Sequence, residues 1–495
     1  MGEHPPCTRK VAGSSPAIST CLFLSYPENF IKIKFVIKWY NIKKQFFTGR
    51  EKMKKSVDSL VKIMSKREIE EEFIKKLSIV SSNLFKIFNL FIPKKKPPTR
   101  EICFTLMKEL EEVETFLDDY GASQNKDFFY LRELIGSMRW INIALFHCLH
   151  ISARISNYIL QLNAEENEKF IKDLNENMLF YFKWLKKLGK EFLKEAEKLS
   201  IKLPDEKFSE IITLPKMQKK ILPPDLELNS ERSSENQIYN FLIKFLEGAD
   251  NLNFFVCRKE IFQELTEESF EKFRSSFNQL ESIYDTFIKK TEVEEKIKNF
   301  KSLRGYIATI LHLLEIGKAL IHFYERHSDE VRKYPTSIRI TQIIDKNKIK
   351  ESIKNFVLFY SLFFISKGKQ ICYKIFKSLG TDAEEFIIQT FVLSIPSHRI
   401  EDFHIRPIMP ITQIANKYKL NTYLYFQRKK YNLKSAIEVA IAIPDIRDVL
   451  INEDVEIMIQ GPEKAIKEIC AFLKEKCGAQ IQTECEIFSK DTFIS

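Results

Sequence analysis

Apolar residues recur at alternating steps of three and four along most of this chain, from about residue 54 to residue 380. This spacing puts the apolar side chains on one face of an α-helix, where they pack against other helices. The clearest stretch has its apolar side chains at Ile171, Leu174, Met178, Tyr181, Leu185, Leu188 and Phe192. Only 13 Gly and 17 Pro occur among 495 residues, so helix breakers are few. We therefore expect a mostly α fold built around a long helical bundle.

Clusters of proline divide the helical pattern. They lie at Pro93–Pro98, within Pro204–Ser234 and around Pro335, and they predict two helical halves, residues 53–235 and 236–384. Neither half contains a Gly-rich phosphate loop, an H-E-x-x-H motif or a G-x-S-x-G motif. The helical pattern therefore predicts a fold but no catalytic activity. Association of two copies of the chain through their helical faces stays open.

The basic charge of the chain is concentrated in a leader, residues 1–52. Nine Lys and Arg stand against three Asp and Glu there, which accounts for +6 of the formal charge of +11 and leaves +5 for the rest. Nucleic acid is therefore not an expected partner of residues after the leader. The DNA that encodes Gly13–Pro16 can be the T-arm of a transfer-RNA gene, and the DNA that encodes Gly49–Lys52 can contain a ribosome-binding site. We therefore expect that the start of the chain is mis-assigned and that the true start is Met53. The alternative is a basic, aromatic arm that binds RNA or a membrane.

No part of the sequence predicts passage into or across a membrane. The longest apolar run, Phe356–Ile365, is shorter than the roughly 18 to 20 residues that a span needs. Cys21–Tyr26 is likewise too short for the apolar part of a signal peptide. Nine Cys occur without any C-x-x-C pattern, which is typical of free thiols in a reducing compartment. We expect a cytoplasmic protein with no membrane span.

Two histidines in the first helical half have the spacing of metal ligands. His147 and His150 are three residues apart, which places both rings on nearly one face of a helix. Two ligands do not complete a metal site, and no carboxylate stands at helical spacing beside them. The sequence therefore favours histidines that pack between helices, and it predicts no metal and no other cofactor.

After residue 385 the periodicity changes, which predicts a separate C-terminal module over residues 385–480 and a tail over 481–495. Strands are predicted at 387–395, 422–426, 431–433 and 455–459, and helices at about 406–419, 435–442 and 462–476. The resulting order is β-α-β-β-α-β-α. It indicates an α+β module in which helices cover one face of an antiparallel sheet and the other face is open.

Three motifs in this module resemble one family. Phe403–Pro407 (F-H-I-R-P) is similar to the G-[IL]-H-[AT]-R-P motif of HPr, the histidine phosphocarrier of the phosphoenolpyruvate-dependent phosphotransferase system. Asn432–Ser435 (N-L-K-S) is similar to the start of the second helix in HPr of Gram-positive type. His404 and Ser435 are 31 residues apart, which is the separation of the family's two phosphorylated residues. Val455–Gly461 is similar to the family's last strand.

The resemblance implies an HPr-like open-faced sandwich that carries phosphate. His404 would accept a phosphoryl group from an enzyme I homologue, pass it to an acceptor that the sequence does not identify, and so act as a carrier rather than a turnover enzyme. Arg406 would hold the phosphate oxygens, since its guanidinium stays cationic at any working pH. Ser435 would be the target of a regulatory kinase, and its alternative role is the N-cap of a helix.

This sequence departs from the family pattern around the histidine. Asp402 replaces the family's Gly and follows Glu401, so two carboxylates are expected beside the incoming phosphate. Ile405 replaces a small residue, and Ile443–Asp448 is expected to include an insertion of about five residues. An alternative function is therefore a phosphotransfer-deficient, HPr-like regulatory or structural binding module on a helical scaffold.

Overall fold

The computed structural model describes residues 62–202, 204, 235–256, 265–327, 340–381, 387–427 and 429–484. The chain divides into two units, residues 1–71 and 72–495. In the first unit, Ser65 caps helix α2 (Lys66–Glu68), because its hydroxyl accepts a hydrogen bond from the Glu68 amide at 3.3 Å. The leader and the predicted start at Met53 lie outside the described residues.

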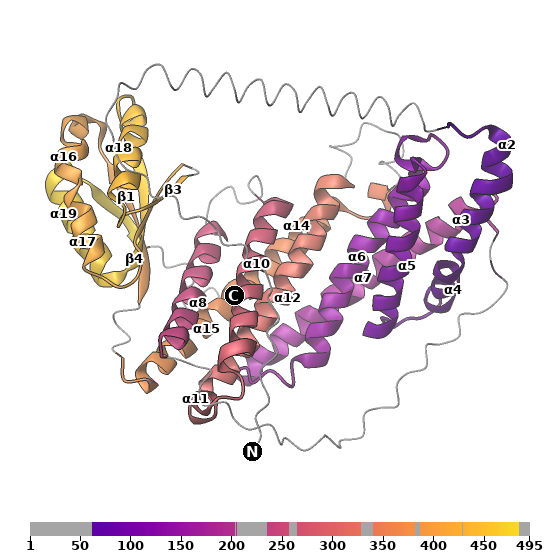
Figure 1. The fold of residues 1–495 in the computed structure, drawn as a ribbon, viewed down its shortest axis with the longest axis horizontal. Helices are drawn as coiled ribbons and strands as arrows, with labels where there is room; N and C mark the ends of the chain where they lie inside the picture. Colours follow the sequence, from indigo (N-terminus) through magenta and orange to yellow (C-terminus); the bar gives the residue numbers. More distant parts are fainter. Residues whose placement is uncertain are drawn as a thin grey trace, which may run out of the picture. The chain divides into compact units, whose positions relative to one another are not determined.

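The second unit begins with a mostly helical region, coloured indigo to orange in Figure 1. A π-helical turn, η1 (Ile69–Phe73), precedes it. Its helices and helical turns are α3 (Ile74–Val80), α4 (Ser82–Phe91), α5 (Arg100–Asp119), η2 (Ala122–Gln124), α6 (Phe129–Arg154), α7 (Ala164–Lys198), α8 (Glu235–Val256), α10 (Glu267–Ile283), η3 (Tyr284–Ile288), α11 (Glu292–Lys296), α12 (Asn299–Arg326), α14 (Lys346–Ser352), η4 (Ile353–Leu358) and α15 (Phe359–Ser378).

The predicted apolar faces are buried. On α7, five of the seven periodic residues have lost almost all contact with solvent: Leu174, Tyr181, Leu185, Leu188 and Phe192. The helix begins at a capping box in which the Asn163 side chain accepts from the Glu166 amide at 2.8 Å. The sequence pattern thus predicts both the helix and the side that it buries.

Helices α6 and α12 lie at the centre of the helical region. α6 packs on α5, α7 and α12, and α12 packs on α6, α10 and α15, so the two predicted halves share one core. Among the described residues, these two helices are long and apolar enough to cross a membrane, but 61% and 83% of their apolar windows are buried. A core helix of a soluble protein has the same properties, so this composition does not identify a span.

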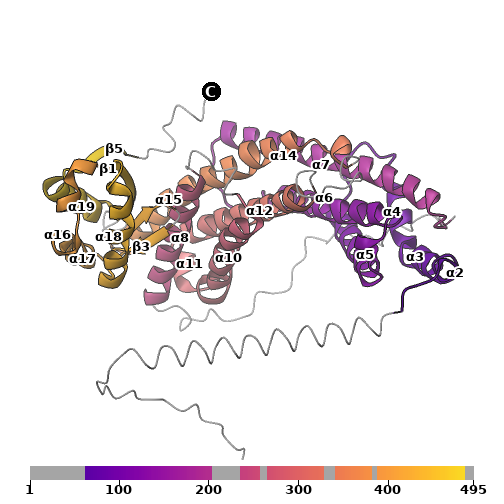
Figure 2. The same cartoon turned by 90° about the horizontal axis from the view of Figure 1, so that it is seen from above.

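The C-terminal module contains a five-stranded antiparallel sheet with the order β3-β2-β4-β1-β5. Its strands are β1 (Ile388–Ile395), β2 (Tyr423–Phe426), β3 (Lys429–Asn432), β4 (Val455–Pro462) and β5 (Gln480–Glu484). Figure 2 shows β1 and β5 side by side. Strand β5 was not predicted, and it extends the sheet into the residues that the sequence pattern assigns to a tail.

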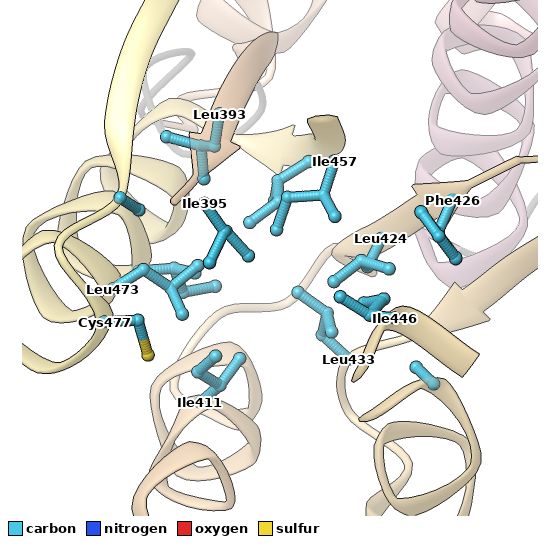
Figure 3. Packing of buried hydrophobic residues seen from close by; sticks show 14 of the residues in the cluster. Leu393, Ile395, Ile411, Leu424, Phe426, Leu433, Ile446, Ile457, Leu473 and Cys477 are labelled. Atoms are coloured by element: carbon cyan, nitrogen blue, oxygen red, sulfur yellow. The ribbon is translucent and has the colours of Figure 1, made fainter. Parts of the chain in front are cut away.

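Helices of the module cover one face of the sheet. They are η6 (Ser397–Asp402), α16 (Ile405–Ile408), α17 (Pro410–Asn416), α18 (Ala436–Leu450) and α19 (Glu463–Cys477). The single helix predicted over 406–419 is divided into α16 and α17 at Met409, whose backbone angles stay helical (φ −51°, ψ −33°). Figure 3 shows the core between the layers, where Leu424 and Ile457 of the sheet face Ile411, Ile446 and Leu473 of the helices.

The other face of the sheet is not open along its whole length, because α8 contacts it. The Gln460 side-chain amide donates to the carbonyl of Asp250 at 3.3 Å, and the Tyr425 hydroxyl donates to Asn251 at 3.3 Å. The prediction of an open face is therefore wrong where β2 and β4 meet α8. These contacts also join the module to the helical region.

Candidate functional site

His404 stands at the junction of η6 and α16. Its backbone is extended (φ −139°, ψ 174°), and it is the residue that precedes the first turn of α16. The preceding residue, Phe403, is buried in the module core and holds the backbone there. Within the described part of the chain, no hydrogen bond joins the half-buried His404 ring to another group. The ring is therefore held close to the surface without a partner.

His404 opens onto a pocket of about 730 Å³. His404 and the first two residues of α16, Ile405 and Arg406, line one part of it. The second half of α18 with the residue after it supplies Ile443, Pro444, Arg447, Asp448 and Ile451. The predicted pair His404 and Arg406 is thus brought together in one pocket. Arg447 and Asp448 join them from a helix more than 30 residues later in the chain.

Two guanidinium groups give this pocket a positive charge. Neither Arg406 nor Arg447 forms an ion pair with any residue that the structure describes. Both cations are therefore available to an incoming anion, and a planar guanidinium can hold two phosphate oxygens at once. One carboxylate, that of Asp448, opposes them from the pocket wall.

The carboxylates expected beside the phosphate lie elsewhere. Asp402 is paired with Arg399, whose Nε lies 2.6 Å from its Oδ2, and Glu401 is exposed on η6. Neither residue lines the pocket around His404. The carboxylate that lines the pocket is that of Asp448, and Arg399 pairs with Asp402. Repulsion of the phosphate by Glu401 and Asp402 stays a prediction.

Helix α18 is longer than predicted, and its extension builds one wall of the pocket. The sequence pattern ends this helix at residue 442 and treats Ile443–Asp448 as an insertion, but α18 continues to Leu450 with Pro444 inside it. Pro444 removes one backbone hydrogen bond, whereas the buried apolar series continues through Ile443, Ile446 and Leu450. That periodicity indicates the longer helix, and with it the position of Arg447, which the sequence motifs do not contain.

Ser435 lies at the other end of α18. It is the N-cap of the helix, and its hydroxyl accepts a hydrogen bond from the Glu438 amide at 3.3 Å. The Glu438 carboxylate in turn accepts from the Asn432 amide at 2.6 Å. Arg447 lies twelve residues further along, about 18 Å at the rise of an α-helix. Ser435 is therefore a structural cap outside the pocket.

His147 and His150 belong to a contact between the two central helices. The Nδ1 atoms of His147 and His312 lie 3.0 Å apart, and the rings of His150 and His312 are separated by 4.0 Å. Burial lowers the pKa of His147 to about 3 and that of His312 to about 2. The described residues contain no group of three or more His, Cys, Asp or Glu that could hold a metal ion.

Comparison with protein-family models, with curated proteins and with solved structures finds no match for this chain.

Proposed function

We propose that the C-terminal module is an HPr-like phosphocarrier that accepts a phosphoryl group on His404 from an enzyme I homologue. The observation that carries the proposal is the pocket in which His404 faces the solvent with Arg406 and Arg447, two cations without a protein partner among the described residues. The three sequence motifs and the order of helices and strands from β1 to α19 add support.

The proposed transfer exchanges one nitrogen–phosphorus bond for another. A ring nitrogen of neutral His404 attacks the phosphorus of a phosphohistidine on the donor. A bond forms to His404, while the bond to the donor ring breaks and its electron pair stays with that ring. The other nitrogen of each ring keeps its proton, so no net proton moves. Positioning and positive charge are the main contributions of the protein to such a step.

The helical region is the proposed target of the phosphorylation signal. Its helix α8 contacts the sheet of the module through Asp250 and Asn251. A covalent connection to so large a partner favours regulation over free diffusion among several clients.

A second candidate function is a binding module of the same fold without efficient phosphotransfer. The Asp448 carboxylate in the pocket wall favours this alternative, because it repels a dianionic phosphoryl group. The two functions differ in one observable property, which is whether His404 takes up phosphate at all.

The test is phosphorylation of the full chain by phosphoenolpyruvate and an enzyme I homologue. Intact-mass and peptide analysis, under conditions that preserve acid-labile phosphate, would measure the modification. We expect one acid-labile phosphate on the unmodified chain and none on His404→Ala. A His147→Gln variant is the matched control, and it should take up phosphate normally. Absence of phosphate with several donors would favour the binding module.

A further inference from the structure

The extension of α18 brings a second arginine to His404. Arg447 lines the same pocket as His404 and Arg406, but it comes from α18, whereas Arg406 comes from α16. The helix that carries it is fixed in place on its inner side, because Ile443, Ile446 and Leu450 are buried in the module core. The Cα atom of Arg447 is therefore held, while its side chain is half-buried and directed away from that core.

Contacts from strand β3 also fix this part of α18. The Asp445 carboxylate accepts hydrogen bonds from the Tyr431 hydroxyl and from the Lys429 ammonium, the latter at 2.7 Å. The Lys429 ammonium lowers the pKa of Asp445, which keeps the carboxylate charged and the contact intact. A helix tied to the sheet two residues before Arg447 can position a guanidinium precisely enough to bind a small anion.

We propose that Arg447 is a second phosphate-binding residue, which contacts the phosphoryl group on His404 together with Arg406. This inference rests on the proposed function. It names a residue that the sequence motifs do not contain, and it assigns a role to the segment that distinguishes this chain from the family pattern.

The charges in the pocket support the assignment. A phosphoryl group on histidine carries close to two negative charges, and Arg406 alone supplies one positive charge. Arg447 supplies a second cation, and three phosphoryl oxygens offer enough acceptors for two guanidinium groups. Neither cation has to leave a protein carboxylate first, since neither is paired with a described residue. The unphosphorylated pocket is thus ready for a dianion.

Arg447 should therefore shift the equilibrium of transfer toward phosphorylated His404. The partition of phosphoryl groups between free donor and free carrier depends on how well each holds the phosphate, and not on how tightly the two proteins dock. A contact between a charged donor and a charged acceptor changes such an equilibrium by about tenfold or more. The partition thus separates phosphate binding from a role in partner docking.

The experiment mixes phosphorylated enzyme I homologue with the full chain, without phosphoenolpyruvate, and measures the phosphate on each protein at equilibrium. Arg447→Gln should hold at least tenfold less phosphate relative to the donor than the unmodified chain. Arg447→Lys, which keeps the charge but loses the planar fork, should fall between them. Lys474→Gln, which removes one positive charge from an exposed position on α19, is the matched control and should stay within twofold.

The ³¹P resonance of the phosphorylated chain gives a second measurement that needs no donor. Loss of a guanidinium contact should raise the pH at which the phosphoryl group titrates, and this shift should appear in Arg447→Gln but not in Lys474→Gln. Urea unfolding of each variant tests for a general loss of structure, and Arg447→Lys keeps the test valid if Arg447→Gln unfolds.

The outcomes separate this inference from the proposed function. If the unmodified chain takes up no phosphate from any donor, the phosphocarrier function fails and this role of Arg447 fails with it. If the unmodified chain is phosphorylated but Arg447→Gln has the same partition, Arg447 is not a phosphate-binding residue and the carrier function stands. A changed rate with an unchanged partition, or an equal loss in Lys474→Gln, would also overturn the inference.

Discussion

His327 in the helical region and His404 in the C-terminal module have the same side chain in opposite surroundings. His327 is buried to 2% side-chain exposure, and its Nδ1 lies 3.0 Å from Oε2 of Glu133, itself buried to 3%. His404 is half-buried, has no hydrogen-bond partner among the described residues, and shares a pocket with two unpaired arginines. One ring is held in place as part of a core, and the other lines a pocket without a hydrogen-bond partner among the described residues.

The difference follows from where each ring lies in its fold. His327 follows the end of α12, one of the two central helices, so neighbouring helices surround it. His404 precedes a short helix at the edge of the module, where the backbone is extended and the ring reaches the surface. A histidine count cannot distinguish these cases, because reactivity depends on exposure and neighbours.

The largest expected difference between the two histidines is in their contribution to the free energy of unfolding. His327→Ala removes a buried ring and leaves Glu133 with one partner fewer, so it should lower the free energy of unfolding by about 3 kcal/mol. His404→Ala should change it by less than about 0.5 kcal/mol. Urea unfolding of the full chain, followed by circular dichroism, measures both. Equal losses in the two variants would show that His404 also has a structural role.

A second prediction concerns acid. His147 and His312 have folded-state pKa values of about 3 and 2, below the ordinary value of 6.5, because burial disfavours their charged forms. Between these values and 6.5 the unfolded chain binds more protons than the folded chain. Stability should therefore be unaffected by these rings above pH 6.5 and fall below it, by up to about 1.4 kcal/mol per pH unit for each ring.

Unfolding midpoints at pH 7 and pH 5 measure this effect. The Nδ1 atoms of His147 and His312 are 3.0 Å apart, so one proton can bridge them but two would repel. His312→Gln removes one of the two titrating rings and should reduce the loss between pH 7 and pH 5. An unchanged dependence in that variant would mean that other groups cause it, among them His322, whose pKa burial lowers to about 4.

Much of the helical region could be predicted from the sequence, because one physical rule covers it. The apolar spacing along α7 indicates both the helix and its buried face, and burial of Leu174, Tyr181 and Phe192 confirms it. The apolar spacing does not predict which helices pack together, since the spacing within one helix contains no information about its neighbour. The contact of His312 with His147 therefore becomes visible only in the structure, where α12 packs against α6.

The candidate site was only half predictable for a related reason. His404 and Arg406 are two residues apart in the sequence, so a local motif contains both. Arg447 reaches the same pocket only because α18 continues beyond Pro444. Proline usually predicts the end of a helix, and the burial of Ile446 and Leu450 outweighs that local preference here. The sequence rule fails where tertiary packing compensates for a lost backbone hydrogen bond.

A third prediction concerns the N-terminal end of α18. Ser435→Ala removes the N-cap and should destabilise the first turn by about 1 kcal/mol, whereas Ser435→Asp should keep the cap. Amide hydrogen exchange of Glu438, whose N–H donates to Ser435, should accelerate about fivefold in the alanine variant only. Amides of the first turn of α7 are the internal control. Unchanged exchange at Glu438 would exclude a capping role.

The smallest expected effect concerns the negative charge in the pocket. Asp448→Asn removes the carboxylate that lines the pocket with His404, and it keeps the size of the side chain. At the separations within an open pocket, such a charge contributes about 0.5–1 kcal/mol to the energy of a dianion. If His404 carries phosphate, the variant should hold two- to fivefold more of it at equilibrium with the donor, and added salt should reduce the difference.

Glu401→Gln is the matched control for this last prediction. Its carboxylate is exposed on η6 outside the pocket, although the sequence places it closer to His404 than Asp448. The control should therefore change the phosphate partition by less than Asp448→Asn does. A larger effect from Glu401 would mean that distance along the chain, and not the pocket built by α18, determines the charge that His404 experiences. That result would also weaken the case for Arg447, which reaches the site through the same wall.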